Sequence, residues 1–564
     1  MTISFRNIYS SFQLHVTALI VLLCFSVQSL SAQTHLFIAD TSLAMIDGHA
    51  SPFDRIRPGD TIFLQSGVRD KLLIRNITGD PVKPVTIMNS GGIVTISTNS
   101  YYGISVSACR YLHLTGTGDL QQPYGIQVRK VEGGAGIGIG NLSSDIELDH
   151  VSVEHTLIGG IYAKTEPDCN YTATREKFTQ FNTSIHDNYI AYTGNEGLYI
   201  GSSNYSGVIF HCNGRDTLLM PPLLNGVKVY NNVIRNTGWD AMQVSSASTN
   251  CQIYKNDIAF DSELEVPGQM VGILMGGGSK CECFSNLIRD GKGDGIENHG
   301  LGGNHIYDNI IVNAGRSFMP LDPAQMKHGI LVSDISMEKD SSVSILFNDI
   351  ISPKSDGIRF QSIRSRNNRI FSNLIVDPGN FELYETGITS FRGPDAYIML
   401  PFANTDVQVR NNFMTRELMK AHIASNDFAP QPGSPLINTG TTAPFAVDVD
   451  FYGNRRTAGW IPDIGAVEYT GSTDTLLHTT EISTIAYPDP VTDELHFTYF
   501  DPLTRTVSLR IYDVRGIRVS AGVFQPGGSG IVHFRTNVSR LLPGVYFYSL
   551  ICGDKNFRGK FIKR

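Results

Sequence analysis

One short pattern recurs along the middle of this chain: an apolar residue, two residues of any kind, Asn, any residue, and a second apolar residue. The eight copies are centred on Asn188, Asn232, Asn256, Asn286, Asn309, Asn348, Asn373 and Asn412. The closest copies are 23 residues apart (309 minus 286), and the longer intervals fit one repeat plus a loop. A repeat of this length indicates stacked units that bury a continuous core only together.

The residue types predict that each unit is made of strands. The apolar positions are mostly β-branched and alternate with polar ones, and no unit has the helical half of other solenoids. A second recurring motif, Gly followed by an aliphatic residue as in Gly295-Ile296, comes after most of the Asn residues. Because stacked strands lie about 4.8 Å apart, one Asn per unit would form a ladder of bonded amides.

This pattern resembles the right-handed parallel β-helix family, with its pectate-lyase-like and NosD-like repeats. The resemblance covers roughly Asp60 to Tyr469 and implies an all-β, right-handed parallel β-helix solenoid. Asp149, between the apolar residues Ile146 and Val151, is expected to replace the ladder Asn in an early unit.

The segments around the solenoid follow from composition. Residues 1–32 resemble a secretory signal peptide, with Arg6 before an apolar run that is too short to span a bilayer. We expect a cap at 33–59, the β-helix at 60–430, and a closing segment at 431–470 that covers the last coil. Such a cover would protect unpaired strand edges from aggregation.

A polar linker at 471–481 leads to residues 482–564, which read as a small antiparallel β-sandwich. This part resembles the C-terminal sorting domain of the type IX secretion system of Bacteroidota. The resemblance is carried by Tyr487-Pro488-Asp489-Pro490, Ile511-Tyr512-Asp513-Val514-Arg515-Gly516, Leu542-Pro543-Gly544-Val545-Tyr546 and Lys560-Phe561-Ile562-Lys563. Asp489 stands where the family more usually has Asn. The resemblance implies the type IX secretion machinery as a partner, and a location outside the cell or on the outer-membrane surface.

Charge and cysteine content narrow the possibilities further. The net charge is −8 and no Lys/Arg-rich run occurs, which argues against a nucleic-acid partner. No later segment is apolar enough to span a membrane, and we expect a monomer. Cys169 and Cys212 flank the coil of Asn188 and are the best disulfide candidates. Cys251 and Cys281 should stack on adjacent coils as small core residues.

Charged and polar residues occur next to the recurring Gly motif. Our catalytic candidates are Asp240, Asp294, Glu297, His328 and Arg359, and our substrate-binding candidates are Glu196, Tyr199, Gln243 and Lys327. Glycoside hydrolysis needs a protonated carboxyl group and a second carboxylate. A polysaccharide lyase needs a cation beside the uronate and a base for its α proton. The alternative is ordinary turn chemistry, because Asp before Gly is common in turns.

Two enzyme resemblances remain open. The order of Asp240, Asp294, His328 and Arg359 is similar to that of the polygalacturonase motifs, although the second Asp of the family pair and its Lys are missing and an extra coil intervenes. A lyase similar to alginate lyase or chondroitinase B would use Lys327 and Arg359, usually with Ca²⁺. No cofactor is certain. The loop with Asp261, Glu263 and Glu265 is the Ca²⁺ candidate, and a solvated loop is its alternative.

An aromatic column precedes the ladder Asn residues, and Tyr230, Tyr254 and Tyr307 are its candidate sugar-binding members. A stacking ladder that stabilises the coils is the alternative. We therefore expect a secreted or surface β-helix protein that acts on extracellular polysaccharide and cleaves an acidic glycan as a lyase or hydrolase. The rival hypothesis is a non-catalytic glycan-binding or adhesin-like protein. Metal-site maturation of the NosD kind is disfavoured by the sorting domain.

Overall fold

The structure is a computed structural model of the chain. It describes residues 36–315, 317–318, 326–379, 397–443, 445, 447–456, 461–471, 485–487, 491–501, 506–524, 530–553 and 555–564. The predicted signal peptide and most of the predicted linker therefore lie outside the described residues.

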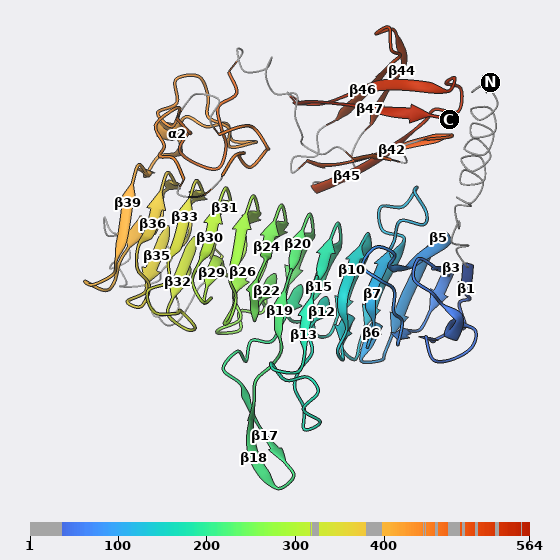
Figure 1. Cartoon of the computed structure of the whole chain (residues 1–564). Helices are drawn as coiled ribbons and strands as arrows, with labels where there is room; N and C mark the ends of the chain where they lie inside the picture. Colours follow the sequence, from blue (N-terminus) through green and yellow to red (C-terminus); the bar gives the residue numbers. More distant parts are fainter. Residues whose placement is uncertain are drawn as a thin grey trace, which may run out of the picture.

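The main body is a parallel β-helix in which each coil adds one strand to each of three faces (Figure 1). The first face contains β7 (Arg110–Thr115), β10 (Ser144–Asp149), β14 (Ser184–His186), β20 (Lys228–Tyr230), β24 (Cys251–Tyr254), β27 (Cys281–Phe284), β30 (Asn304–Tyr307), β33 (Val343–Leu346), β36 (Asn368–Phe371) and β39 (Val407–Arg410). The second contains β8 (Ile126–Val131), β11 (Val151–Thr156), β15 (Tyr189–Thr193), β21 (Val233–Thr237), β25 (Asp257–Ala259), β28 (Leu287–Arg289), β31 (Ile310–Val312), β34 (Asp349–Ile351), β37 (Leu374–Val376) and β40 (Phe413–Thr415). These two faces join at the N-terminal end through the long strands β3 (Thr61–Arg69) and β5 (Val85–Thr98).

The third face is a separate parallel sheet of 12 strands. Its members are β2 (Met45–Asp47), β4 (Leu72–Arg75), β6 (Tyr102–Ser107), β9 (Ala135–Gly140), β12 (Ile161–Ala163), β16 (Leu198–Ile200), β22 (Met242–Val244), β26 (Val271–Met275), β29 (Asp294–Asn298), β32 (Ile330–Ser333), β35 (Ile358–Gln361) and β38 (Ile398–Met399). The inward side chains of the three faces form one continuous apolar core.

The asparagine ladder is confirmed. Each buried Asn sits at the turn between the first and second faces, and its Nδ2 donates to the Oδ1 of the next Asn along the stack. The distances run from 3.0 Å at Asn188 to 2.9 Å at Asn373. The repeated Asn therefore fixes the register of successive coils.

Asp149 does not take the ladder position that the sequence predicts. The backbone amide of Val151 donates to the Oδ1 of Asn188 at 3.0 Å, so Val151 occupies that rung. Asp149 pairs in register with His186 and lies two residues earlier, at the end of β10. The prediction was wrong because the buried residues Leu148 and Ile185, not an Asn, set the register of this coil.

Two further boundaries differ from the expectation. β1 (Leu36–Ala39) already pairs in parallel with β3, and β2 pairs with β4, so the solenoid begins inside the segment 33–59 that we expected to be a cap. The described part of the closing segment touches the last coil, where Nδ2 of Asn411 donates to the carbonyl of Thr439, but it also extends beside earlier coils. It folds back along the second face, where Phe451 and Val467 pack on Leu287 and Ile310.

A buried ion pair fixes this segment to the coils. Arg456 donates to Asp308 and to Glu468, and both side-chain groups of the Arg456–Asp308 pair are almost completely inaccessible. The short helix α2 (Leu418–Ala421) lies between β40 and this closing segment (Figure 1). This ion pair and the apolar contacts of Phe451 and Val467 together hold the segment against the coils.

Loops leave the coils mainly around Asn188. The hairpin of β17 (Val208–Cys212) and β18 (Arg215–Leu219) projects from the body (Figure 1). β13 (Thr179–Phe181), β19 (Leu223–Asn225) and β23 (Ala247–Thr249) form a small parallel sheet. Cys169 and Cys212 form a disulfide, as expected. Cys251 and Cys281 do stack on adjacent coils, but they are also bonded to each other, which the sequence analysis did not predict.

The C-terminal part forms two antiparallel sheets, as the sequence predicts. One contains β41 (Ile485–Tyr487), β42 (Glu494–Asp501) and β45 (Gly530–Asn537). The other contains β43 (Val507–Tyr512), β44 (Arg518–Phe524), β46 (Gly544–Cys552) and β47 (Lys555–Lys563). This part has its own apolar core around Leu495, Phe497 and Leu550.

Candidate active site on the third face

The outward side of the third face carries one row of aligned side chains. Strand register aligns Tyr162, Tyr199, Gln243, Leu274, Glu297, Leu331 and Arg359 on successive coils. The two leucines separate Glu297 from Gln243 and from Arg359. The backbones of Glu297 and Arg359 are therefore two strand spacings, or about 10 Å, apart.

A second row lies at the entry to these strands and is buried. It contains Glu196, Asp240, Asp294, His328 and Asp356, and none of them is more than 3% exposed. Because these side chains are buried, they do not face solvent. Their charges still act on the ionisable groups of the first row. The sequence pattern identifies both rows but does not reveal this difference in depth.

Asp294 and Lys327 form the centre of the second row. The Nζ of Lys327 lies 2.8 Å from Oδ2 of Asp294 and donates to the carbonyl of Met270 at 3.2 Å. The backbone amide of His328 donates to Oδ1 of Asp294 at 2.5 Å. Burial alone would raise the pKa of Asp294, but the positive charge of Lys327, helped by His328, lowers it below the usual value. Asp294 is therefore a carboxylate.

Glu297 and His299 form a carboxyl–imidazole pair that is partly exposed to solvent. The Nε2 of His299 lies 3.3 Å from Oε2 of Glu297, and the two side chains are 20% and 14% exposed. Burial, followed by the negative charge of Asp294, raises the pKa of Glu297 well above the usual value. Burial lowers the pKa of His299 to about 4. These shifts favour the protonated form of Glu297, and they make His299 a neutral imidazole at neutral pH.

Asp240 lies too deep to contact a polymer in this conformation. Its side chain is 0% exposed, and neither carboxyl oxygen makes a hydrogen bond of acceptable geometry within the described chain. Burial, then the charges of Glu196 and Asp261, raises its pKa well above the usual value, although the charge of Lys327 and the Val271 amide oppose this shift. The raised pKa favours the protonated form of Asp240, and its burial separates the carboxyl group from solvent.

Arg359 supplies the exposed positive charge of the first row. Its side chain is 22% exposed, its Nη1 lies 3.0 Å from Oδ2 of Asp356, and its Nε donates to Gln361. His328 lies below and accepts a hydrogen bond at Nδ1 from the backbone amide of Asp356. His328 is 3% exposed, so it supports Asp356 and does not face solvent.

The N-terminal end of the first row is aromatic and basic. The hydroxyl of Tyr162 donates to Oε2 of Glu196 at 2.7 Å. The Nζ of Lys164 lies 3.8 Å from the ring centroid of Tyr199, which is a cation–π contact. Gln243 is buried and donates to Ser245. Tyr162, Tyr199 and Lys164 therefore offer an apolar ring surface beside a cation.

The aromatic column of the first face stacks on itself. The rings of His186, Tyr230, Tyr254, Phe284 and Tyr307 follow one another at centroid distances of 4.4–4.9 Å and interplanar angles of 3–11°. A sugar ring binds an aromatic face, and the faces of the inner members are occupied by their neighbours. Only ring edges and hydroxyl groups remain for a ligand.

The acidic loop does not fit the expected Ca²⁺ ligand set. Glu263 and Glu265 both face the Nζ of Lys292, at 3.6 and 2.8 Å. Asp261 is buried and accepts hydrogen bonds from Ser262 and the Gly293 amide. A Ca²⁺ ion needs six to eight oxygen ligands, whereas these three carboxylates already serve other partners.

Three members of the site were missed by the sequence analysis. His299 stands two residues after Glu297, directly after the end of β29, so extending the strand alternation by one residue would have found it. Tyr162 and Lys164 precede the first Asn of the repeat, where the pattern gives no register.

The fold and the C-terminal part define a class: an exported parallel β-helix protein. Residues 485–564 match the family described as the secretion system C-terminal sorting domain, which confirms the predicted sorting domain and a location outside the cell or at the outer-membrane surface. Within the part of the chain that the structure describes, no helix has the length and apolar character needed to cross a membrane.

Further comparisons concern the β-helix. A solved structure of a PL6 family polysaccharide lyase from Pseudopedobacter saltans is similar at 14% sequence identity and a TM-score of 0.30, and the match covers 66% of this chain and 92% of that one. Comparison with curated protein sequences finds no match.

Proposed function

We propose that the protein cleaves an acidic extracellular polysaccharide by β-elimination at the third face. Glu297 would be the proton donor, His299 the base and Arg359 the group that binds the uronate carboxylate. The observation that carries this proposal is the pair of Glu297 and His299, whose side chains are 3.3 Å apart and partly exposed and whose pKa values shift in opposite directions.

The spacing of this pair favours elimination over hydrolysis. The two carboxyl groups of a glycoside hydrolase flank the bond and lie about 5–9.5 Å apart. Glu297 and His299 lie side by side on one face, which suits removal and return of protons on one side of the sugar. Asp240 and Asp294, the carboxyl groups that a hydrolase would need, are 0% and 1% exposed.

The chemistry balances without a further reactant. Neutral His299 takes the proton from C5 of a uronate, the C4–O bond breaks, and a C4=C5 double bond forms. Glu297 gives its proton to the departing O4. Arg359 would neutralise the carboxylate, which makes the C5 proton more acidic, and Tyr199 with Lys164 would hold a neighbouring sugar.

The test is an incubation of the full chain with a panel of uronate-containing and neutral polysaccharides. Absorbance of the unsaturated product and total reducing ends would be measured together. We expect both to rise on a uronate polymer. The variants Glu297→Gln and His299→Asn should each lower kcat at least about 10²-fold, as loss of a general acid or base does.

Glu282→Gln is the matched control, because Glu282 points outward from β27 on the first face. It should keep full activity. New reducing ends without new absorbance would show hydrolysis and refute the elimination step. Retention of the polymer without any cleavage across the panel would instead support the glycan-binding alternative.

A further inference from the structure

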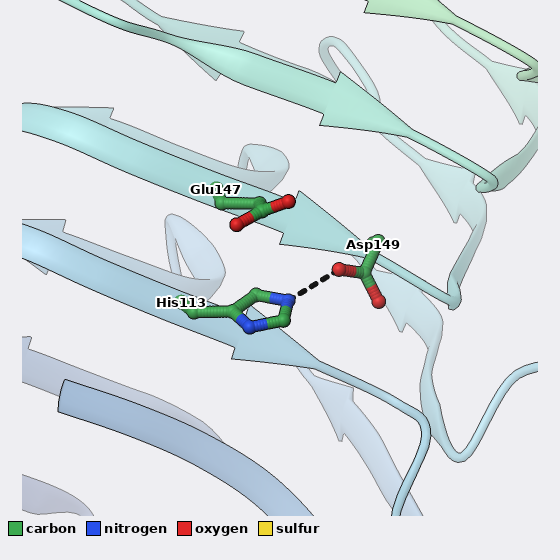
Figure 2. A group of neighbouring side chains, drawn as sticks. All are labelled: His113, Glu147 and Asp149. Atoms are coloured by element: carbon green, nitrogen blue, oxygen red, sulfur yellow. Dashed lines mark hydrogen bonds and ion pairs between the residues drawn. The ribbon is translucent and has the colours of Figure 1, made fainter. Parts of the chain in front are cut away.

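A second cluster of chemically active side chains lies on the first face, away from the proposed active site. His113 on β7 and Glu147 and Asp149 on β10 point to the same side of the sheet (Figure 2). One ligand atom from each of these three residues lies within 4.8 Å of the others. His186 on β14 joins them, with Nε2 3.0 Å from Oε1 of Glu147 and 3.9 Å from Oδ2 of Asp149.

The register of three adjacent coils brings these atoms together. His113 pairs with Glu147, and Asp149 pairs with His186, so all four side chains leave the sheet on its outward side. Asp149 and His186 are buried, whereas the side chain of Glu147 is the most exposed of the four. The cluster is therefore accessible from solvent on the side of Glu147 and His113.

His186 is oriented as a metal-binding histidine would be. Its Nδ1 lies 2.6 Å from Oδ2 of Asp187, and its ring stacks on Tyr230 at 4.4 Å. With Nδ1–H donated to Asp187, Nε2 faces Glu147 and Asp149 as a hydrogen-bond donor, and a bound metal ion would take the place of its proton. Ligating histidines in proteins are usually held by this kind of carboxylate contact.

Asp149 is oriented in the same way. Its Oδ1 accepts hydrogen bonds from the Thr115 hydroxyl at 2.5 Å and from Nδ1 of His150 at 2.7 Å. These contacts fix the carboxylate and leave Oδ2 facing His113 and His186. The hydrogen bonds of Asp187, Thr115 and His150 therefore orient two of the four ligand atoms, Nε2 of His186 and Oδ2 of Asp149.

We propose that His113, Glu147, Asp149 and His186 bind one late first-row divalent cation of the Zn²⁺ type. Two imidazole nitrogens and two carboxylate oxygens are a ligand set that such ions take, whereas Ca²⁺ and Mg²⁺ prefer oxygen-only sites. Four protein ligands complete a tetrahedral shell, so the ion would be structural. It would join three coils at the N-terminal end of the aromatic column.

The rival interpretation is an ion-pair network that ends the aromatic column without a metal. The experiment uses the full chain after treatment with a chelator, and titrates Zn²⁺ by calorimetry. Co²⁺ is added in parallel, because its visible absorption reports tetrahedral coordination by nitrogen and oxygen. We expect one equivalent to bind and the melting temperature to rise with metal concentration.

The variants separate the two interpretations. His186→Ala and Asp149→Asn should remove saturable binding, and Asp187→Asn should weaken it about 10–100-fold because Asp187 orients His186. His113→Gln, at the more exposed of the two histidines, is the variant least expected to disturb folding and should also remove the Co²⁺ spectrum. His211→Ala is the matched control, because His211 and Asp216 form an exposed pair without other ligands.

Absence of saturable Zn²⁺ binding by the native chain would overturn the proposal and support the ion-pair network. Binding that survives in His113→Gln and His186→Ala, or that His211→Ala removes, would overturn it as well. Circular dichroism of each metal-free variant establishes that the chain is folded before its binding is measured.

Discussion

Replacement of one inner ladder residue, Asn286→Ala, should destabilise the solenoid strongly. The Nδ2 of Asn286 donates to Oδ1 of Asn309 at 2.9 Å and to the carbonyl of Ile253 at 3.0 Å. Its Oδ1 accepts from the backbone amide and from Nδ2 of Asn256, at 3.1 and 2.9 Å. At about 1 kcal/mol for each of these bonds, the loss is about 4 kcal/mol.

The last rung provides the matched comparison. Asn412 accepts from the amide and Nδ2 of Asn373 and donates to the carbonyl of Ile370. Unlike Asn286, it is half-buried, so water can replace part of what an Ala would remove. We expect Asn412→Ala to cost only about 1–2 kcal/mol.

Urea unfolding, with an unchanged slope, would give both free energies. Hydrogen exchange of peptides that span β24 and β30 would localise the effect, because a repeat contacts mainly its neighbours. Equal costs for the two variants, or a cost below about 1 kcal/mol for Asn286→Ala, would refute the view that buried amide bonds hold the coils in register.

Three further predictions concern single side chains. Burial raises the pKa of Asp349 to about 7, so the folded state keeps a proton that the unfolded state releases. The free energy of unfolding should therefore fall as pH rises from about 4 to 7, by at most about 4 kcal/mol. In Asp349→Asn, which still accepts from the Ala466 amide, urea unfolding across this range should show a weaker pH dependence. Tyr254→Ala should cost about 1–3 kcal/mol in the same assay without changing retention on a glycan column, because both ring faces are stacked; a large loss of retention would contradict this. As pH increases, the kcat/KM of the proposed lyase should rise with a pKa of about 4, from His299, and fall again where Glu297 loses its proton. A pH profile without this fall at high pH would contradict the acid role of Glu297.

The coils were predictable because they repeat. Eight copies of one pattern determine the strand period, the turn and the ladder, and a single error cannot shift them all. Where the copy lacks Asn, as at Asp149, the sequence gives no such reference, and the predicted rung was displaced by two residues. The disulfide of Cys251 and Cys281 shows the same limit, since stacking was predictable from spacing but the bond was not.

The site was harder to predict because the repeat pattern does not specify how deeply each side chain is buried. Asp240 and Asp294 look alike in sequence, each before the Gly or Ala that opens a strand. In the structure Asp294 has Lys327 as a partner, whereas Asp240 has no cation within hydrogen-bonding reach among the described residues, and burial raises its pKa. Such a difference depends on a long side chain that enters from another coil, which no periodicity specifies.

Lys327 is therefore the residue at which structure and function can be separated. Lys327→Met would leave the Asp294 carboxylate buried without its cation, and removal of one partner of a buried pair costs about 3–5 kcal/mol. The double variant Lys327→Met/Asp294→Asn removes both charges while Asn can still accept the His328 amide, so most of the stability should return. If the double variant is stable and fully active on a uronate polymer, the pair serves folding alone. If it is stable and inactive, the pair positions Glu297 for catalysis, whereas a cost below about 1 kcal/mol for Lys327→Met would show that the ion pair does not hold this row together.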